Sequence, residues 1–450
     1  MFLRCIRVGV LMDDLTAARA QMEVSLGFHM VFAALGIALP LLMVIAEGLA
    51  LRTGQAHYRD LAKQWSKATA LLFAVGAVSG TALSFELGLL WPTFMAQSGS
   101  LIGPAFAMEG FAFFIEAIFI GIYLYGWDRL SPRAHWLAGF PIAVSGLLSG
   151  LFVVATNAWM QVPVGYEVVD GDIVQTDPLA VFKTPVWLPM AFHLLVSCYV
   201  AAAWSVAGVY AWARLRGKRS RYHTSALRIS MVVAVASTVL LGPSGDLAAH
   251  AVARYEPVKF ASMEALFETQ AGAPFTIGGI PLQDEERTIL ALEIPYLLSL
   301  LAHRDPHAVV QGLDQVPREL EPNVLLVHLS FQVMIAIGGV LAVMAVWYAW
   351  GWWRRRASHL DSPWLLRGIV ACGPLAYVAI QAGWLVTEAG RQPWTIRGVL
   401  LTRDAVTPAP GLLVTFLAFT LLYVVLAFVL VALLRLLASR PPPSAREEAA

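Results

Sequence analysis

Charged residues and cysteine are scarce in this sequence. Asp, Glu, Lys and Arg make up only 14% of 450 residues, against 58% hydrophobic residues and a mean hydropathy of +0.67. A soluble domain is about a quarter charged, so this composition predicts an integral membrane protein. The net charge of +1 excludes a strongly basic nucleic-acid binder. The three cysteines (Cys5, Cys198, Cys372) lie far apart, which provides neither a disulfide framework nor a thiolate metal site.

Long apolar runs, in contrast, are plentiful. Nine stretches are long and apolar enough to cross about 30 Å of hydrocarbon, near residues 22–49, 69–92, 101–126, 135–157, 186–213, 227–243, 323–350, 365–388 and 410–436. We therefore expect an all-α integral membrane protein with nine transmembrane helices. Its parts are an N-terminal segment (1–21), helices 1–6 (22–243), an external loop (244–322), helices 7–9 (323–436) and a disordered cytoplasmic tail (437–450).

The distribution of positive charge predicts the orientation. Lys and Arg concentrate after helices 1, 3, 5 and 7, at 52–67, 129–133, 214–228 and 354–367, whereas the loop between helices 2 and 3 has no charge. Because positive loops remain in the cytoplasm, we expect the N-terminus outside and the C-terminus inside. The 244–322 loop and the GRQPW stretch at 390–394 are then outside.

A few ionisable or metal-ligating side chains lie inside the predicted spans, where they are costly and mark function. Of the ten histidines, only His29 and His193 lie well inside a span, and the others are expected to be solvated or interfacial. Glu47, near the inner end of helix 1, is expected to reach the interface. Given the direction of each helix, one set falls in the outer half of the bilayer: His29, Glu86, Glu109, His193, Met334 and Glu388.

These residue types leave two classes of protein open. Imidazole and thioether groups are haem-iron ligands, and a His/Met pair gives a six-coordinate, electron-transferring iron. Glu116 lies seven residues after Glu109, two helical turns deeper on the same face, as a proton path requires. The residues alone predict either a multi-haem membrane redox protein or a proton-coupled transporter.

Several motifs together resemble subunit I of the cytochrome bd-type quinol oxidases. They are AMEGFAFFIEA (107–117), YGWDRL (125–130), NAWMQVP (157–163), FETQAGAPFTIGGIP (267–281) and GRQPW after WLVTEA. The resemblance covers nearly the whole chain and includes nine helices. It implies a bacterial terminal oxidase of the cytoplasmic (inner) membrane, with haems in the outer half of the bundle.

The same resemblance implies roles for individual residues. His193 and Met334 match the axial ligands of a low-spin haem b. His29 and Glu388 match the ligands of two high-spin haems, a haem b plus haem d or a second haem b. Further matches are an acid beside the oxygen site (Glu109), an acid on the proton route (Glu116), a tryptophan between haems (Trp384) and an arginine near haem propionates (Arg391).

The external loop resembles the quinol-binding loop of that family, in its short form. Lys259 and Glu264, five residues apart, match a lysine and a glutamate that bind ubiquinol or menaquinol. Two positions depart from many relatives. Gln332 replaces an arginine two residues before the methionine, and SFELG, with Glu86, replaces EFQFG. Both departures resemble the cyanide-insensitive branch, and the loss of positive charge should make reduced iron less favoured.

The predicted function is therefore oxidation of quinol at the outer face and reduction of O2 to water with cytoplasmic protons. The family resemblance implies a second large membrane subunit, subunit II, and allows for a small single-span subunit. Two alternatives remain. A di-haem cytochrome b electron-transfer subunit would contain only six-coordinate haems, and a proton-coupled transporter would contain no haem.

Overall fold

The computed structural model describes residues 12–169, 172–175, 177, 179–355 and 360–439. Within these residues, nine helices are long and apolar enough to span a membrane. They are α1 (Asp14–Thr53), α2 (Ala56–Leu90), α3 (Pro92–Tyr125), α4 (Pro132–Gln161), α5 (Trp187–Leu215), α6 (Arg221–Tyr255), α9 (Val324–Arg355), α10 (Pro363–Ala389) and α12 (Leu412–Ala438). The predicted all-helical membrane fold is confirmed. Most of the expected tail lies outside the described residues.

The helices are longer than the apolar runs that predicted them. The sixth, expected to end near 243, continues to Tyr255, and the third begins at Pro92 rather than near 101. Hydropathy detects only the part of a helix that suits hydrocarbon, whereas backbone hydrogen bonding continues until a cap or a proline stops it. The segment between α6 and α9 is correspondingly shorter than the 244–322 loop expected.

Local residues decide where several helices begin and end. Asp13 caps α1 by accepting a hydrogen bond from the Thr16 amide (2.6 Å), and Gly54 ends it with φ 69°, a left-handed conformation that suits glycine. Ser131, Ser220 and Ser362 cap α4, α6 and α10 in the same way as Asp13. Proline follows the serine cap of α4 and of α10, where its missing N–H costs nothing.

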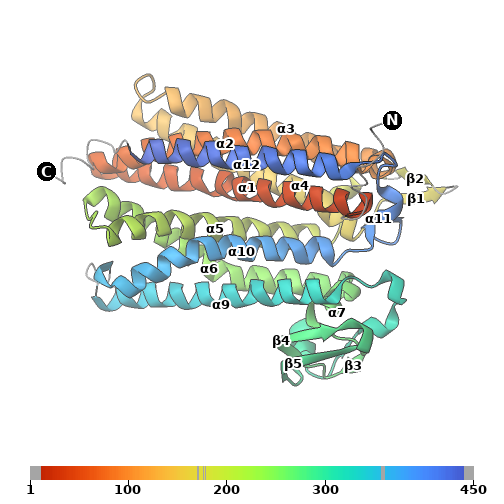
Figure 1. Cartoon of the computed structure of the whole chain (residues 1–450). Helices are drawn as coiled ribbons and strands as arrows, with labels where there is room; N and C mark the ends of the chain where they lie inside the picture. Colours follow the sequence, from red (N-terminus) through yellow and green to blue (C-terminus); the bar gives the residue numbers. More distant parts are fainter. Residues whose placement is uncertain (1–11, 170–171, 176, 178, 356–359, 440–450) are drawn as a thin grey trace, which may run out of the picture.

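The nine long helices lie side by side in one bundle (Figure 1). One core joins α5, α6, α9 and α10 around Trp204, Met231 and Leu341. A second core joins α1–α4 with α6 and α12, around Leu42, Trp65 and Tyr123. Small residues let the helix backbones approach closely, as at Ala203, Ala207 and Ala211 of α5, which are buried.

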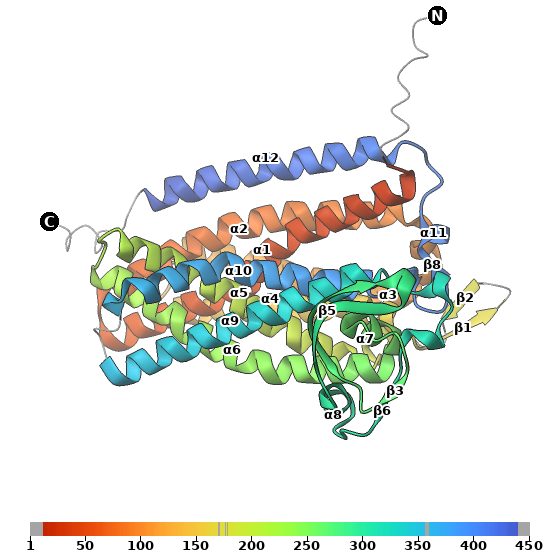
Figure 2. The same ribbon diagram turned by 60° about the horizontal axis from the view of Figure 1, so that its bottom comes forward.

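Short elements gather at one end of this bundle, which we call the loop end (Figure 2). Between α6 and α9 they are α7 (Pro257–Glu264), β3 (Gln270–Ala271), β4 (Phe275–Leu282), β5 (Arg287–Ile294), α8 (Leu297–His303) and β6 (Val309–Val310), with 3-10 turns at 283–285, 313–315 and 318–320. Elsewhere they are β1 (Tyr166–Val169), β2 (Asp172–Gln175), a 3-10 turn at 180–182, β7 (Trp394–Ile396), β8 (Leu400–Leu401) and α11 (Thr402–Ala405). The strands pair antiparallel as β1–β2, β3–β6, β4–β5 and β7–β8.

At the opposite end of the bundle, the described residues form short connections, such as 54–55, 126–131 and 216–220. We call this end the short-connection end. The helices alternate in direction, so α1, α3, α5, α9 and α12 all begin at the loop end. Residues early in these helices therefore lie near residues late in α2, α4, α6 and α10.

Candidate functional site

The two intramembrane histidines are held in the same manner. Nδ1 of His29 on α1 lies 2.9 Å from the Ser79 hydroxyl on α2, and Nδ1 of His193 on α5 lies 3.2 Å from the Ser244 hydroxyl on α6. A glycine follows each serine and makes room for the ring: a methyl group on Gly80 would lie 3.0 Å from His29 Cε1. Fixing Nδ1 through a hydrogen bond orients Nε2, as in histidines that bind metals.

Met334 on α9 contacts a glycine in a comparable way. A methyl group on Gly383 of α10 would lie 2.8 Å from the Met334 sulfur, so any side chain at 383 would require Met334 to shift. His193 and Met334 thus come from the four helices that share one core, α5, α6, α9 and α10. The structure brings the two predicted axial ligands into the same half of the bundle.

Glu388, at the end of α10, is the centre of a polar network at the loop end. One carboxylate oxygen accepts from Asn157 Nδ2 on α4 (2.5 Å), and the other accepts from Arg391 Nη2 (2.5 Å). Gln161, one turn after Asn157, donates to the Thr387 carbonyl (3.1 Å). The GRQPW turn and the NAWMQVP motif, far apart in the sequence, therefore form one structure.

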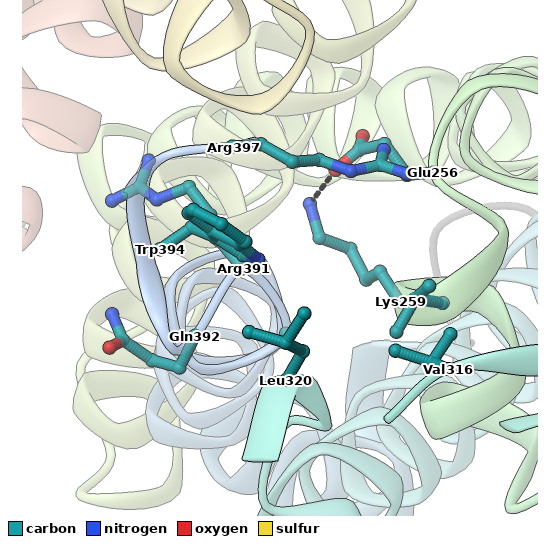
Figure 3. Close-up of a pocket in the computed structure, with 10 residues that line it drawn as sticks. Glu256, Lys259, Val316, Leu320, Arg391, Gln392, Trp394 and Arg397 are labelled. Atoms are coloured by element: carbon teal, nitrogen blue, oxygen red, sulfur yellow. Dashed lines mark hydrogen bonds and ion pairs between the residues drawn. The ribbon is translucent and has the colours of Figure 1, made fainter. Parts of the chain in front are cut away.

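Lys259 of α7 belongs to this network as well. Its Nζ donates to Gln161 Oε1 (2.6 Å) and forms an ion pair with Glu256, and both charged side chains are buried. Figure 3 shows Lys259 extended toward Glu256 beside Arg397, at a cavity of about 80 Å³ that Arg391 also lines. Burial lowers the pKa of Lys259, while the neighbouring Glu256 carboxylate acts in the opposite direction. Burial also lowers the pKa of Arg397.

Some N–H groups near this network have no protein partner. Nε and Nη1 of Arg391 and Nε1 of Trp384 are buried without a hydrogen-bond acceptor among the described residues. Each buried unpaired donor costs about 1–3 kcal/mol, so such a cluster is expected only where another group completes it. Donors of this kind, with a guanidinium among them, suit the carboxylates of a bound molecule.

Glu264, at the other end of α7, does not contact Lys259. Its carboxyl is buried, and Oε2 has no partner within the described residues. Burial raises the pKa of Glu264 to about 8, and the Thr276 backbone N–H opposes this shift. Five residues place two side chains well apart around a helix. The predicted Lys259/Glu264 pair is therefore two separate positions, one within the Glu388 network and one beside β4.

Two residues of α9 fasten β4 to the bundle. The Gln332 amide donates to the Thr276 carbonyl (2.8 Å) and accepts from the Gly278 N–H (3.0 Å). One turn earlier, the His328 ring lies 2.8 Å from both the Met263 and the Gly278 carbonyl oxygens. Gln332 and His328 thus hold the loop in place.

We expect Gln332→Ala to loosen β4. The change removes both hydrogen bonds to the strand, worth about 1–3 kcal/mol in total, so amide exchange at Gly278 should accelerate by about tenfold or more. Hydrogen–deuterium exchange of the purified complex measures this. Leu329→Ala, an exposed position on the same helix, is the control and should leave β4 unchanged. Equal exchange in Gln332→Ala and wild type would contradict the fastening role.

The three predicted acids do not form one chain of contacts. Glu86 is buried against α1 and accepts from Gln21 (3.2 Å), which also binds Thr415 of α12. Glu116 on α3 is buried against α4, where a methyl group on Gly146 would lie 3.6 Å from both carboxylate oxygens. Glu109, expected early in its helix, lies midway along α3, about 25 Å from its start, because that helix begins at Pro92.

Several residues that complete these groups were not singled out from the sequence. Asn157, Gln161 and Glu256 are polar residues near helix ends, where a solvated side chain is the ordinary expectation. The spacing of Asn157 and Gln161 in NAWMQVP, one helical turn, was the available signal. Three of the histidines expected to be solvated or interfacial are not solvated, because His57, His135 and His328 are buried within the protein. Glu47, expected at the interface, is buried as well.

Comparison with known proteins identifies the class that this fold and these residues define. Residues 17–442 match the family model described as cytochrome bd terminal oxidase subunit I. The chain is 36% identical over 428 residues to the putative cytochrome bd menaquinol oxidase subunit I of Bacillus subtilis (strain 168), covering 94% of this chain and 96% of that one. It is 31% identical to the cytochrome bd ubiquinol oxidase subunit 1 of the same organism, covering 94% and 93%.

Further similarity extends to another species and to a solved structure. The cytochrome bd-II ubiquinol oxidase subunit 1 of Escherichia coli (strain K12) is 28% identical, with 87% of this chain and 90% of that one covered. The structure of the bd oxidase from Geobacillus thermodenitrificans superposes with a TM-score of 0.91 at 38% identity, covering 96% of this chain and 99% of that chain. The fold and its membrane helices are thus those of a solved oxidase.

The chain belongs to the cytochrome bd terminal oxidase subunit I family. It is accordingly a multi-pass membrane subunit of a haem-containing respiratory quinol oxidase, a complex with a second subunit. Membership of this family excludes the two alternatives, an electron-transfer subunit and a haem-free transporter.

Proposed function

We propose that this subunit oxidises quinol at the loop end of the bundle and reduces O2 to water with protons drawn from the short-connection end. Lys and Arg lie mainly at the short-connection end, as at residues 52–67 and 214–221. The positive-inside rule then assigns that end to the cytoplasm and the loop end to the outside of a bacterial inner membrane. Charge separation follows because protons are released and taken up on opposite faces.

The residues at the loop end fit haem as the cofactor. We assign His193 and Met334 to a low-spin haem b, and His29 and Glu388 to two high-spin haems, a haem b plus haem d or a second haem b. The serine bonds to Nδ1 of both histidines and the unpaired N–H groups of Arg391 and Trp384 support this assignment. Bound haem supplies one-electron transfer and an iron at which O2 is reduced.

The Glu388–Arg391 network is the observation that supports this proposal most. Asn157 and Arg391 together fix both oxygens of Glu388, so the carboxylate cannot rotate freely. The remaining N–H groups of Arg391 stay free to bind carboxylates, as propionates require. A helix end that binds no ligand would not need a partly buried acid, a buried guanidinium and a buried lysine together.

At the quinol site, we assign Glu264 as the proton acceptor. Its Oε2 is buried and unpaired in the described structure, and a base must reach the hydroxyl whose proton it takes. The positive charge of Lys259 is balanced by the Glu256 carboxylate in an ion pair. The proposed role of Lys259 is to join the quinol loop to the Glu388 network through Gln161.

The activity should therefore depend on pH through Glu264. Burial raises the pKa of Glu264 to about 8, so the carboxylate that accepts protons forms only as the pH rises through that value. The kcat/KM for quinol should rise with pH up to about 8 and then level off. Glu264→Gln should lose this rise and lower kcat/KM by about 100-fold.

Glu268→Gln is the matched control, because Glu268 is exposed on the same segment. It should keep the wild-type profile. If Glu264→Gln also keeps that profile between pH 6 and 9.5, Glu264 is not the acceptor.

The proposed partners are subunit II, with room for a small single-span subunit, and quinol and O2 as substrates. The named relatives include menaquinol and ubiquinol oxidases, so both quinols are proposed substrates.

The function as a whole is tested on the purified complex. We expect quinol-dependent O2 consumption, a low-spin haem b signal and a carbon-monoxide-reactive high-spin haem. Carbon monoxide binding should occur in the reduced complex and should stop O2 consumption. Absence of a carbon-monoxide-reactive haem would rule out the oxidase assignment.

A further inference from the structure

A second buried group of titratable side chains lies at the short-connection end, far from the residues assigned above. It consists of Glu47 on α1, Tyr123 on α3 and His135 on α4, which are 4%, 0% and 2% exposed. Tyr123 donates from its hydroxyl to Glu47 Oε2 (2.5 Å), and His135 Nδ1 lies 2.6 Å from Glu47 Oε1. Three helices thus meet at one carboxyl group.

The hydrogen bonds of His135 determine where protons lie in this cluster. Nε2 lies 2.8 Å from the Tyr123 carbonyl oxygen, which only accepts, so Nε2 carries a hydrogen. Between Nδ1 and Glu47 Oε1 there is one further proton position. A proton there belongs either to the imidazole or to the carboxyl, and moving it requires no change of side-chain rotamer. The pair can therefore gain or lose one proton. When the proton leaves, Nδ1 and Oε1 are both acceptors, so their 2.6 Å contact must lengthen.

The cluster is aligned with the acids of α3. Glu109, Glu116 and Tyr123 are spaced by seven residues, which places them on one face of the helix at intervals of about 10.5 Å. The α4 residues opposite are glycines with the same spacing. A methyl group on Gly146 would lie 3.6 Å from the Glu116 carboxylate, and one on Gly139 would lie 3.3 Å from the Tyr123 ring.

Helix α1 completes this seam between α3 and α4. Ile37 lies against Gly146, and Val44 lies against Gly139. Glu47 follows Val44 by three residues, which continues the same face of α1 toward the short-connection end. The seam therefore runs from Glu116 to the Glu47 cluster along three helices.

The cluster lies close to the surface at the short-connection end. The His135 ring packs on Trp127 (centroids 4.0 Å apart), and Arg59 and Lys63 lie over the same indole, at 5.7 and 5.1 Å from its centroid. Asp128, next to Trp127, is 90% exposed and pairs with Arg59. One aromatic layer thus separates the buried pair from charged, solvated side chains.

We propose that Glu47 and His135 form the proton-loading station of this oxidase, which takes protons from the short-connection face and passes them along the α3 seam toward Glu116. This inference rests on the proposed function. Loading places a proton between Nδ1 and Oε1. Release of that proton leaves a Glu47 carboxylate beside neutral His135. The proton then passes to Glu116 through intervening water, because the spacing of about 10 Å along α3 is too long for a direct hydrogen bond. Tyr123 is a positioning residue that holds Oε2.

The whole oxidase complex, reconstituted in vesicles with a pH-sensitive dye inside or outside, provides the test. Glu47→Gln keeps the size of the side chain and its bond from Tyr123 but cannot exchange a proton. We expect quinol-driven O2 consumption to fall by about tenfold or more, with unchanged haem content and unchanged KM for quinol. The solvent deuterium isotope effect on kcat should increase. Glu47→Asp, which still binds a proton, should recover part of the rate.

His135→Gln and Tyr123→Phe distinguish a role in proton exchange from a role in positioning Glu47. His135→Gln should slow turnover like Glu47→Gln, whereas Tyr123→Phe should lower the rate by only about two- to threefold. Tyr210→Phe is the matched control. It removes a partly buried tyrosine hydroxyl at the same end, which accepts from Trp65 Nε1 (3.0 Å) outside the seam, and it should leave turnover unchanged.

The outcomes are distinguishable. An inactive wild-type complex contradicts the proposed function itself. An active wild type with an assembled, haem-replete Glu47→Gln or His135→Gln variant that keeps the wild-type rate and pH profile overturns the loading station. If Glu47→Gln does not assemble, Glu47→Asp and His135→Gln provide the test. Wild-type isotope effects and pH profiles in both variants would contradict the proposal.

Discussion

Replacing Met334 with leucine is expected to remove the low-spin haem signal and to slow electron entry from quinol by about 100-fold. Leucine matches methionine in volume but has no sulfur, so the packing against Gly383 is retained while the ligand atom is lost. The reduced-minus-oxidised spectrum measures the haem, and stopped-flow reduction by quinol measures the rate. O2 consumption driven by an artificial electron donor should fall less than consumption driven by quinol.

Met344→Leu is the control for this prediction. Met344 is buried on the same helix, three turns further along, in the core that joins α5, α6, α9 and α10. Its replacement tests the effect of losing a buried thioether without removing a ligand, and the spectrum should not change. A Met334→Leu complex with an unaltered low-spin signal would show that iron takes another ligand.

Replacing Glu388 with glutamine is expected to abolish one high-spin haem site and to lower O2 consumption by about 100-fold. The amide keeps the size of the side chain, yet it carries no charge for Arg391 and no carboxylate for iron. Arg391 would then retain a buried charge without an anion, which is strongly destabilising for the local structure. Pyridine haemochrome analysis and the carbon monoxide difference spectrum measure the loss.

Thr387→Val is the matched control, since Thr387 is adjacent and its hydroxyl bonds only within its own helix, to Gly383 (3.2 Å). It should retain full haem content and activity. If Glu388→Gln keeps the carbon monoxide signal and full haem content, Glu388 is not a ligand, and the network with Asn157 and Arg391 would then serve only to shape the loop end.

The predictions in the loop differ from these in kind. Gln332→Ala acts on the backbone of β4, and its effect is a change of local stability rather than of chemistry. The family resemblance singled out position 332 for its missing charge. In the structure the Gln332 side-chain amide makes the two hydrogen bonds that a neighbouring strand would make with β4. It donates to the Thr276 carbonyl and accepts from the Gly278 N–H. A glutamine can make this pair of contacts with a backbone, whereas an arginine only donates.

Individual site residues were predictable to different degrees. His29 and His193 stood out because an ionisable side chain inside an apolar span is costly, and both occupy the interior of long helices. Glu388 stood out for the same reason. Their partners did not, because Ser79, Ser244 and Asn157 are small polar residues whose significance depends on the neighbour they face.

Lys259 and Glu264 show most clearly what the local sequence does not specify. Both residues belong to one short helix, and the family resemblance assigned both to quinol binding. Their side chains leave α7 in different directions, so Lys259 meets Gln161 and Glu256, and Glu264 lies beside β4. The rotation of α7 is set by the packing of Phe260 and Ala261 in the loop core, which local sequence does not encode.

By itself, the sequence determined the class of protein, the number of membrane-spanning helices and the family. These properties depend on hydropathy, charge and motif residues, which act locally and can be read along the chain. Only the tertiary structure decided which side chains meet. Glu47 and His135 are 88 residues apart, and Lys259 and Gln161 are 98 apart. Such pairs form because packing fixes the rotation and depth of each helix, so a buried acid and its partner are defined by the bundle as a whole.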